Sequence, residues 1–287
     1  MNRFSLISGN YSKKTFLFLN TIFMIIITFI MVIPLLKIFV DSLDAKGGYD
    51  FRLLPQKISL NAYLRIMTEP SLLRSFGISC FVTIVGTLLA LALTSTGAFV
   101  LTRRDLPGRK FFVWMIMFTM MFNGGLVPTY MLMRNIHLTN TVWSVILPLA
   151  INTYHLILMK NFFEDINISI YESAAIDGAT PLAIFLRILL PMCKPALAAI
   201  GLFYMVGYWN NWFEFTIYIQ DTALKNFQVK LREMVLTDDK GTSTDVSVYA
   251  NTLKNAVIIT AAIPMIILYP FVQRYFVIGL NLGAVKE

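Results

Sequence analysis

Five side chains near residue 210 have the types and the spacing of a site for a polyhydroxylated ligand. They fall at i, i+4, i+7, i+8 and i+11, on one face of a helix, and they are Tyr204, Tyr208, Asn211, Trp212 and Phe215. Aromatic rings offer flat apolar faces to the C–H surfaces of sugars, and amides can bond hydroxyls. The alternative to a ligand site is an interfacial aromatic belt, in which Trp and Tyr side chains lie at the boundary between membrane and water. A belt leaves the adjacent amides of Asn210 and Asn211 unexplained, because amides facing lipid are costly.

Two further polar residues lie in apolar surroundings. Glu214 is the only acid within a long apolar run, and a carboxylate in such a place is a functional candidate by default. Its position near the end of the run also allows the side chain to reach water. His155 could relay protons or bind a ligand, but we prefer a packing role because a lone histidine without a visible partner usually has one.

Catalytic patterns are absent from the sequence. There is no G-x-x-x-x-G-K-[ST] phosphate loop, no H-E-x-x-H and no G-x-S-x-G, the patterns of nucleotide binding, zinc proteolysis and serine hydrolysis. Two histidines and two cysteines, Cys80 and Cys193, offer neither a metal cluster nor a disulfide framework. We predict no catalytic residue, no metal site and no cofactor in this chain, which is not expected to be an enzyme.

The elements that position these residues are predicted to be membrane helices. The mean hydropathy is +0.68 and only 14% of the residues are charged, too few for the surface of a soluble domain. The net charge of +8 does not indicate nucleic-acid binding, because the basic residues stand at the ends of apolar runs. Runs long enough to cross a hydrocarbon core of roughly 30 Å occur at 15–36, 75–102, 111–133, 138–159, 195–213 and 255–273. The sequence therefore predicts an all-α polytopic membrane protein with six transmembrane helices.

Basic residues predict the orientation of these helices. The N-terminal segment 1–14 carries Arg3, Lys13 and Lys14 without an acid, and the short loop 103–110 carries four basic residues against Asp105. Such segments are typical of the cytoplasmic side. We expect a cytoplasmic segment 1–14, a membrane domain 15–279 with a cytoplasmic loop 161–194, and a cytoplasmic tail 280–287.

The stretch 167–195 predicts a short helix, a bend and a second helix that leads back to the membrane. Ser169 and Glu172 have the spacing of a capping box. Gly178 can take the left-handed conformation that ends a helix. Thr180 and Pro181 then supply a capping hydroxyl and a proline at the first helical position.

This stretch resembles the E-A-A-x-x-x-G-A-x(8)-I-x-L-P loop of ABC-importer permeases. The matching residues are Glu172, Ala174, Gly178, Ala179, Ile188, Leu190 and Pro191. In that family the loop is the coupling helix, which docks in a cleft on a separate ATPase subunit. The resemblance implies that the coupling residues are Glu172, Ser173, Ala174, Ala175, Asp177, Gly178 and Ala179. Ser173 departs from the family alanine but is small enough to preserve a docking surface.

Three other segments are similar to carbohydrate-importer permeases of the maltose-permease-like, binding-protein-dependent branch. They are N-G-G-L-V-P-T-Y at 123–130, F-Y-M-V-G-Y-W-N-N-W-F at 203–213 and Q-R-Y-F-V-I-G-L-N-L-G-A-V-K at 273–286. The resemblance covers essentially the whole chain and implies the type I ABC-importer permease fold. It further implies an oligosaccharide substrate, a second homologous permease, ATPase subunits that bind ATP, and an extracellular solute-binding protein. The expected location is the lipid of the bacterial cell membrane.

Three alternatives remain at this stage. A permease for a non-sugar solute would share the coupling loop. An ion-coupled secondary transporter would show buried acids or an inverted repeat, and neither is clear in this sequence. A membrane-embedded enzyme would need a catalytic pair inside the predicted helices, and none is present.

Overall fold

The computed structural model describes residues 4–46, 51–122, 124–236 and 244–284, and the side chains of 13–46, 51–122, 124–236, 249–270 and 273. Within these residues all regular structure is helical except one isolated antiparallel bridge between Asp44 and Ile58. This confirms the predicted all-α class. Most of the predicted N-terminal segment 1–14, namely residues 1–12, and the predicted tail 280–287 lie outside the residues with described side chains.

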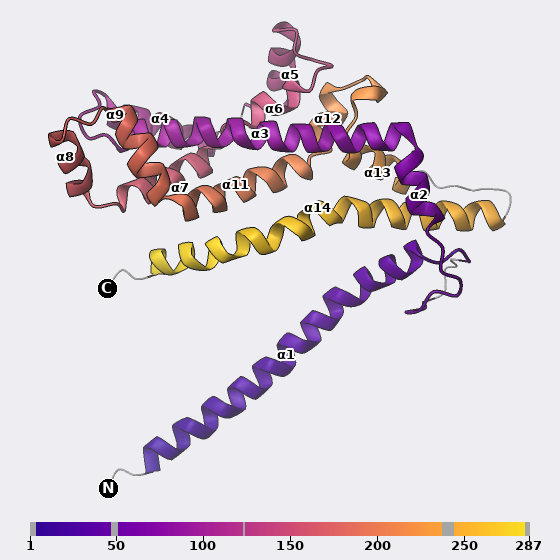
Figure 1. Ribbon diagram of the computed structural model, residues 1–287. Helices are drawn as coiled ribbons and strands as arrows, with labels where there is room; N and C mark the ends of the chain where they lie inside the picture. The colour runs from indigo at the N-terminus through magenta and orange to yellow at the C-terminus, as the bar shows by residue number, and fades with distance from the viewer. Residues whose placement is uncertain (1–3, 47–50, 123, 237–243, 285–287) are drawn as a thin grey trace. The chain divides into compact units, whose positions relative to one another are not determined.

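The helices follow one another along the chain as labelled in Figure 1. They are α1 (Phe4–Ser42), α2 (Asn61–Thr68), α3 (Pro70–Thr102), α4 (Arg109–Met121), α5 (Leu126–Asn135), α6 (Trp143–Leu149), α7 (Thr153–Glu164), α8 (Ile168–Ile176), α9 (Pro181–Ala183), the π-helix η1 (Ile184–Leu189), α10 (Leu190–Met192), α11 (Lys194–Trp209), α12 (Phe213–Tyr218), the 3-10 helix η2 (Thr222–Leu224), α13 (Phe227–Leu236) and α14 (Thr244–Ala284).

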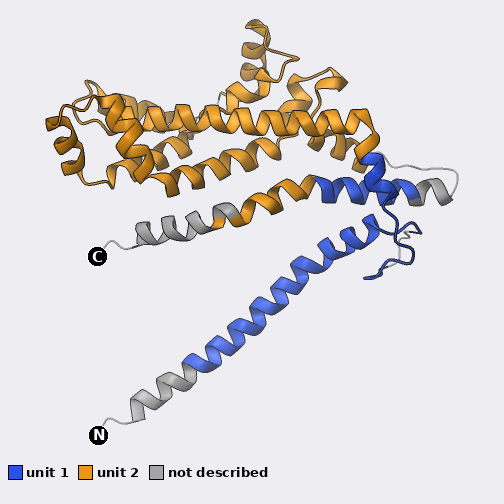
Figure 2. Cartoon of the chain, in the orientation of Figure 1, with its two compact units in different colours: residues 1–66, 237–260 blue, residues 67–236, 261–287 orange. Residues whose placement is uncertain are grey.

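The chain divides into two compact units, coloured separately in Figure 2. Unit 1 comprises Met1–Ile66 and Thr237–Thr260. Its connection after α1 is organised by Asp44, whose carboxylate accepts the backbone N–H groups of Lys46 at 3.0 Å, Gln56 at 2.9 Å and Lys57 at 3.2 Å. Burial alone would raise the pKa of the Asp44 carboxyl, but these donors and the charge of Arg52 outweigh it and lower the pKa.

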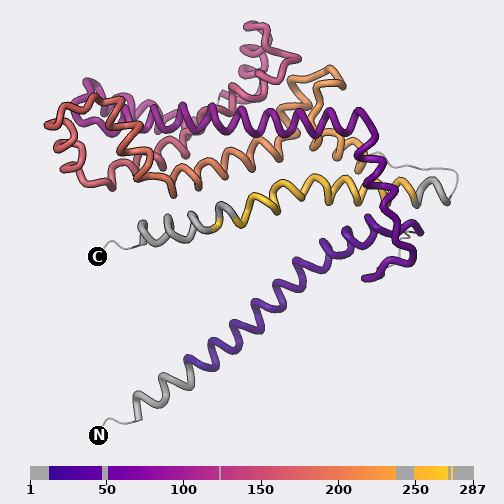
Figure 3. Tube along the Cα trace, viewed as in Figure 1, coloured from indigo at the N-terminus to yellow at the C-terminus, as the bar shows by residue number. Residues whose placement is uncertain are grey.

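Unit 2 comprises Met67–Leu236 and Ala261–Glu287. Its centre is the long helix α3, which packs along α11 and α7, and Figure 3 shows α3 and α11 running side by side. Gly86 permits this close approach, because a Cβ there would lie 2.7 Å from Cζ of Tyr208. The Tyr208 hydroxyl donates to the backbone oxygen of Ile146 at 2.9 Å, which fixes the ring between helices.

Three helices are individually long and apolar enough to cross a membrane, namely Lys13–Ser42, Pro70–Thr102 and Tyr249–Pro270. They contain most of the predicted runs 15–36, 75–102 and 255–273. The predicted runs 111–133 and 138–159 fall on bent pairs of helices, α4 with α5 and α6 with α7, and the run 195–213 begins in the second helix of a third bent pair, α9–α10 with α11; each pair is bent by more than 40°. The described residues thus hold three unbroken spans, or up to six if each bent pair counts as one.

The predicted continuous helix 195–213 is wrong at its end. α11 stops at Trp209 and α12 begins at Phe213. The break is held by side chains from elsewhere, because the Asn226 amide donates to the backbone oxygen of Asn211 and the Ser79 hydroxyl accepts the N–H of Phe227 at 2.9 Å. Periodicity along one segment cannot reveal such partners.

Candidate functional site

The first candidate site is the α8 corner, which we define as residues 168–183. The predicted capping box is wrong, because α8 begins at Ile168 and places Ser169 inside its first turn. The cap is Asn167, whose side-chain oxygen accepts the Ser169 N–H at 3.0 Å. An asparagine side chain can accept the same backbone hydrogen bond as a serine hydroxyl. The helix therefore starts two residues earlier than predicted but is still capped by a side-chain oxygen.

The end of α8 agrees with the prediction. Gly178 has a φ of 80°. The Gly178 N–H donates to Ala175 O at 3.1 Å and the Ala179 N–H donates to Ala174 O at 2.9 Å, the pair of bonds that defines a Schellman motif. The next helix begins with Thr180, whose hydroxyl accepts the N–H of Ala183 at 3.3 Å, followed by Pro181 at the first position. The predicted helix–bend–helix is confirmed.

The predicted coupling residues are mostly on the outside of this corner. The exposed members are Glu172, Ser173, Ala175, Asp177 and Gly178. Ala174 is buried, with 8% of its surface exposed, and Ala179 is half-buried. The sequence analysis did not select Ile176, which is 85% exposed at the end of α8.

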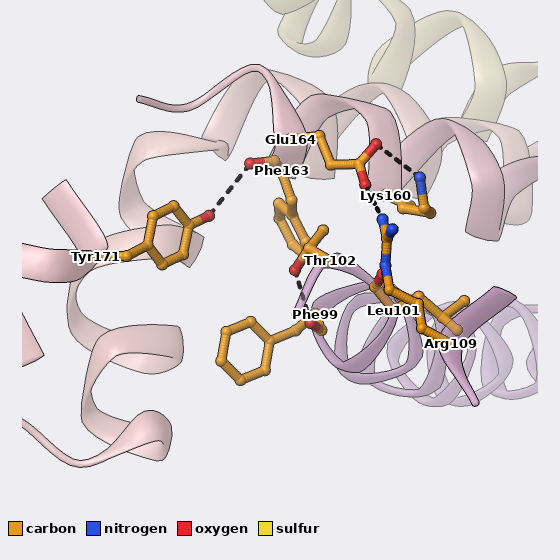
Figure 4. A network of polar contacts seen from close by, with 8 residues as sticks. All are labelled: Phe99, Leu101, Thr102, Arg109, Lys160, Phe163, Glu164 and Tyr171. Atoms are coloured by element: carbon orange, nitrogen blue, oxygen red, sulfur yellow. Dashed lines mark hydrogen bonds and ion pairs between the residues drawn. The ribbon is translucent and has the colours of Figure 1, made fainter. Parts of the chain in front are cut away.

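A groove of about 980 Å³ lies beside α8. Its walls come from the turn after α3, the end of α7 and α8 itself, and its charged side chains are Arg103, Arg104, Asp105, Arg109, Lys160, Glu164 and Glu172. In Figure 4, Glu164 bridges Lys160, at 2.6 Å, and Arg109. Arg109 Nε also donates to the backbone oxygen of Leu101 at 2.6 Å, so this network ties the ends of α3, α4 and α7 together.

α8 is joined to the same region by Tyr171. Its hydroxyl donates to the backbone oxygen of Phe163 at 3.2 Å. Burial, followed by the charge of Cys193, raises the pKa of the Tyr171 hydroxyl to about 12. The phenol therefore keeps its proton, and this hydrogen bond, throughout the neutral range.

The second candidate site is the aromatic cavity, a hollow of about 300 Å³ between α7, α11 and α12. It is lined by Leu149, Asn152, His155, Phe203, Tyr204, Gly207, Tyr208, Asn210, Asn211, Trp212, Phe213 and Glu214. This volume is at the small end of the roughly 300–1,000 Å³ found for small-molecule sites. Aromatic faces, amides and one carboxylate are the groups that bind sugar rings and hydroxyls.

Four of the five predicted pathway residues line this cavity, namely Tyr204, Tyr208, Asn211 and Trp212. Phe215 does not, because its side chain is completely buried in the core. Arg232 of α13 lies over the Trp212 ring, with its Cζ 3.8 Å from the ring centroid, an arrangement that holds an exposed guanidinium by cation–π attraction.

The two tyrosines are tied into the helix packing. The Tyr204 hydroxyl is 2.7 Å from Oγ1 of Thr94 and accepts the backbone N–H of Asn152 at 3.1 Å. Tyr204 and Tyr208 are only 4% and 2% exposed. Both residues line the cavity, and their hydroxyls join its wall to the neighbouring helices.

Sequence reasoning did not select Asn152 and expected only a packing role for His155, although it weighed a ligand-binding role for that residue. Asn152 caps α7, its side-chain oxygen accepting the N–H of His155 at 3.2 Å, and both residues line the cavity. Pro148, in the middle of a predicted span, was the one signal of a break nearby. Among the residues with described side chains, no group of three or more His, Cys, Asp or Glu residues is placed to hold a metal ion.

Two known proteins are similar to most of this chain. The polygalacturonan/rhamnogalacturonan transport system permease protein YtcP of Bacillus subtilis (strain 168) is 39% identical over 274 residues, covering 92% of this chain and 96% of its own. Protein LplC of the same organism is 38% identical over 266 residues, 90% of each chain.

A solved structure gives the same result. One chain in the crystal structure of a bacterial ABC transporter involved in the import of the acidic polysaccharide alginate matches with a TM-score of 0.85 and 30% identity, covering 92% of this chain and 98% of that one. No family model matches the sequence. The relatives nevertheless confirm the resemblance found in the sequence, and the chain belongs to the carbohydrate ABC transporter permeases, membrane subunits that are not themselves enzymes.

Proposed function

We propose that this permease forms half of the pathway of an ATP-driven importer for an acidic oligosaccharide. The aromatic cavity carries the proposal, because it combines ring faces with the amides of Asn152, Asn210 and Asn211. The acidic class is supported by the names of the relatives, which refer to polygalacturonan, rhamnogalacturonan and alginate. Tyr204, Tyr208, Asn211 and Trp212 form the pathway wall, while Phe215 supports it from the core.

The α8 corner is the proposed contact with a separate ATPase subunit, which binds the ATP. Its support is an exposed helix with small side chains at Ser173 and Ala175 and the uncovered Ile176 at its end. Burying an isoleucine side chain on a partner contributes about 1.5–3 kcal/mol. Glu172 and Ala179 face the groove beside α8, where they position the corner.

In this mechanism closure of two ATPase subunits displaces the α8 corners of two homologous permeases. Each corner moves as a unit because its caps are internal. Tyr171 and the Arg109–Glu164–Lys160 network transmit the displacement to α7, α3 and α4. Helices that move as rigid bodies then open the cavity to one side of the membrane and close it to the other.

The proposal also fixes an orientation. Both termini, the loop 161–194 and the basic turn 103–110 face the cytoplasm, and the solute-binding protein delivers the sugar from outside. Single cysteines near residue 10 and within 103–109 should resist impermeant thiol reagents added to intact cells, whereas one near Asp239 should react. Labelling of 103–109 from outside would contradict the orientation.

The function is tested by transport in proteoliposomes that contain this chain, its partner permease, the ATPase and the binding protein. A labelled trigalacturonate should accumulate when ATP is supplied, and maltotriose, a neutral sugar of equal length, should not. Accumulation of maltotriose alone would correct the substrate class. Accumulation of a peptide and of neither sugar would overturn the carbohydrate function.

The docking surface has its own matched test. Ile176→Asp should release the ATPase subunits during purification, because a carboxylate cannot be buried in their cleft without a partner. Leu54→Asp is the control, since Leu54 is also strongly exposed, at 79%, but lies in the loop after α1. Full retention of the ATPase by the Ile176→Asp complex would show that α8 is not the docking helix.

A further inference from the structure

The charge of the aromatic cavity does not by itself suit an acidic sugar. Among the described residues, its wall includes the carboxylate of Glu214 but neither a lysine nor an arginine. A uronate unit carries a carboxylate of its own, and two like charges repel each other. An acidic oligosaccharide therefore needs a cation close to this wall.

Arg232 of α13 supplies a cation beside the wall. Its guanidinium lies over the ring of the cavity residue Trp212, with Cζ 3.8 Å from the ring centroid. The start of α13 is also fixed to the cavity, because the Asn226 amide donates to the backbone oxygen of Asn211, another lining residue. The Asn226 side-chain oxygen in turn accepts the Val229 N–H at 3.0 Å. These contacts hold the arginine at the edge of the cavity.

The guanidinium is open to a ligand. Arg232 is exposed, and no acid is paired with it within the part of the chain whose side chains are described. Glu233, the next residue of α13, is instead 2.6 Å from Lys225 and 3.7 Å from Lys230. Contact with an aromatic ring uses none of the guanidinium N–H groups as hydrogen-bond donors. They stay available for a carboxylate, which arginine can bind through two parallel hydrogen bonds.

We propose that Arg232 binds a carboxylate of the acidic oligosaccharide at the edge of the aromatic cavity and so selects acidic over neutral sugars. The cavity of about 300 Å³ is at the small end of ligand sites, so sugar units beyond those inside it reach the guanidinium. In the proposed orientation α13 lies on the outer side, from which the binding protein delivers the sugar. This inference rests on the proposed function and gives its substrate selectivity to a residue next to the cavity wall.

Two other roles would also explain an exposed arginine at this position. An arginine that only covers Trp212 can be replaced by methionine, whose unbranched side chain packs against aromatic rings. An arginine that contacts the solute-binding protein would set the concentration of that protein at which ATP hydrolysis is half-maximal. An arginine that binds the sugar needs its charge even when the binding protein is saturating.

The experiment measures uptake of labelled trigalacturonate by the complete transporter in proteoliposomes with saturating sugar-loaded binding protein. Arg232→Met keeps the cover over Trp212 and removes the charge, whereas Arg232→Lys keeps a charge. Arg134→Met is the matched control, because Arg134 at the end of α5 is also exposed but does not line the cavity.

We expect Arg232→Met to lower the rate of uptake by about fivefold, since it removes a charge-assisted contact with the sugar. Arg232→Lys and Arg134→Met should stay within about twofold of the native chain. The concentration of binding protein that gives half-maximal ATP hydrolysis should be the same in all three variants.

Each other outcome overturns the inference. Native uptake by Arg232→Met would show that the charge makes no contact with the sugar. Equal losses in Arg232→Met and Arg232→Lys would show that the arginine acts by its shape, as a cover for Trp212. An equal loss in Arg134→Met would show a general effect of surface charge. A loss in Arg232→Met that additional binding protein restores would assign the arginine to the interface with that protein.

The same measurements separate this inference from the proposed function. If the native transporter carries maltotriose instead of trigalacturonate, or carries no sugar, the proposed function fails and the inference fails with it. Native uptake of trigalacturonate together with an unaffected Arg232→Met variant overturns the inference alone.

Discussion

The hydrogen bonds that shape the α8 corner join neighbours in the chain, whereas those that shape the aromatic cavity join distant helices. The caps of the corner connect residues 2 and 3 positions apart. The bonds of Tyr204 and Tyr208 span 110, 52 and 62 positions. The corner is also largely exposed, while the tyrosines of the cavity are almost completely buried.

This difference gives the two sites different mechanical roles in the proposed function. A corner whose geometry is set locally keeps its shape when it is displaced, so it can transmit force from a partner. A cavity whose walls are joined only across helices changes its shape when those helices move. Changes in the corner should therefore affect coupling at little cost in stability, and changes in the cavity wall should affect stability first.

The largest expected effect belongs to Gly86→Ala in α3, which packs against the cavity residue Tyr208. Its new Cβ would lie 2.7 Å from the Tyr208 ring, which is buried and held by Ile146. Such overpacking costs about 1–3 kcal/mol, so the purified complex should melt at a lower temperature and transport poorly. Gly77→Ala in the same helix is the control, because no atom lies within 4 Å of its new Cβ. Equal melting of the two variants would contradict this account.

Gly178→Val should have the next largest effect, on coupling. A Cβ at Gly178 has open space, with no atom within 4 Å, so the cost arises from its φ of +80° alone, about 1–2 kcal/mol for a residue with a side chain. Uptake and transport-stimulated ATP hydrolysis should fall together, and the melting temperature should fall by less than in Gly86→Ala. Gly178→Asn should retain both activities, because asparagine tolerates this conformation. Normal uptake by the valine variant would refute the coupling role.

Tyr204→Phe should have a smaller effect, on stability. It removes the hydroxyl that joins Thr94 to Asn152 and should reduce the free energy of unfolding by about 1 kcal/mol. Thr94→Val removes the other partner, and the double variant should lose less than the sum of the two single losses. Strict additivity, measured by denaturation, would mean that the two hydroxyls do not interact.

Tyr171→Phe should have the smallest effect, about 0.5 kcal/mol from one hydrogen bond to Phe163. Burial and then Cys193 raise the pKa of Tyr171 to about 12. A group whose pKa is higher in the folded state adds its full contribution to the free energy of unfolding below its pKa in the unfolded chain, which is near 10 for tyrosine. That contribution is lost as the pH rises through the pKa of the folded state. The stability difference between variant and native chain should thus be constant from about pH 6 to pH 9. A difference that disappears within that range would contradict the raised pKa.

The same contrast explains what the sequence could predict. The stop at Gly178 and the restart at Thr180 follow from local rules about φ, caps and proline. The N-cap was predicted at Ser169 and lies at Asn167, and the same local rules allow either residue to cap the helix. Four of the five residues that were selected by periodicity line the cavity, out of the twelve that line it in all.

What the sequence could not predict depends on tertiary contacts. The break after Trp209 is contacted by the Asn226 amide, which comes from a separate part of the chain and donates to the backbone oxygen of Asn211. The place of His155 in the cavity depends on how α7 packs against Phe203 and Tyr204. The spacing of residues within one segment carries no information about contacts with another segment. Hydrophobic patterns therefore predicted where the helices lie but not where they break.

The π-helix η1, Ile184–Leu189, lets the connection after the α8 corner absorb a change in chain length. A π-helical turn holds about one residue more than an α-helical turn, although each completes one full turn about the helix axis. Deleting a single residue there would therefore convert the π-helical turn into an α-helical turn while the flanking segments keep their orientation. The face that α8 presents outward is thus protected against the loss of one residue in a segment outside both sites.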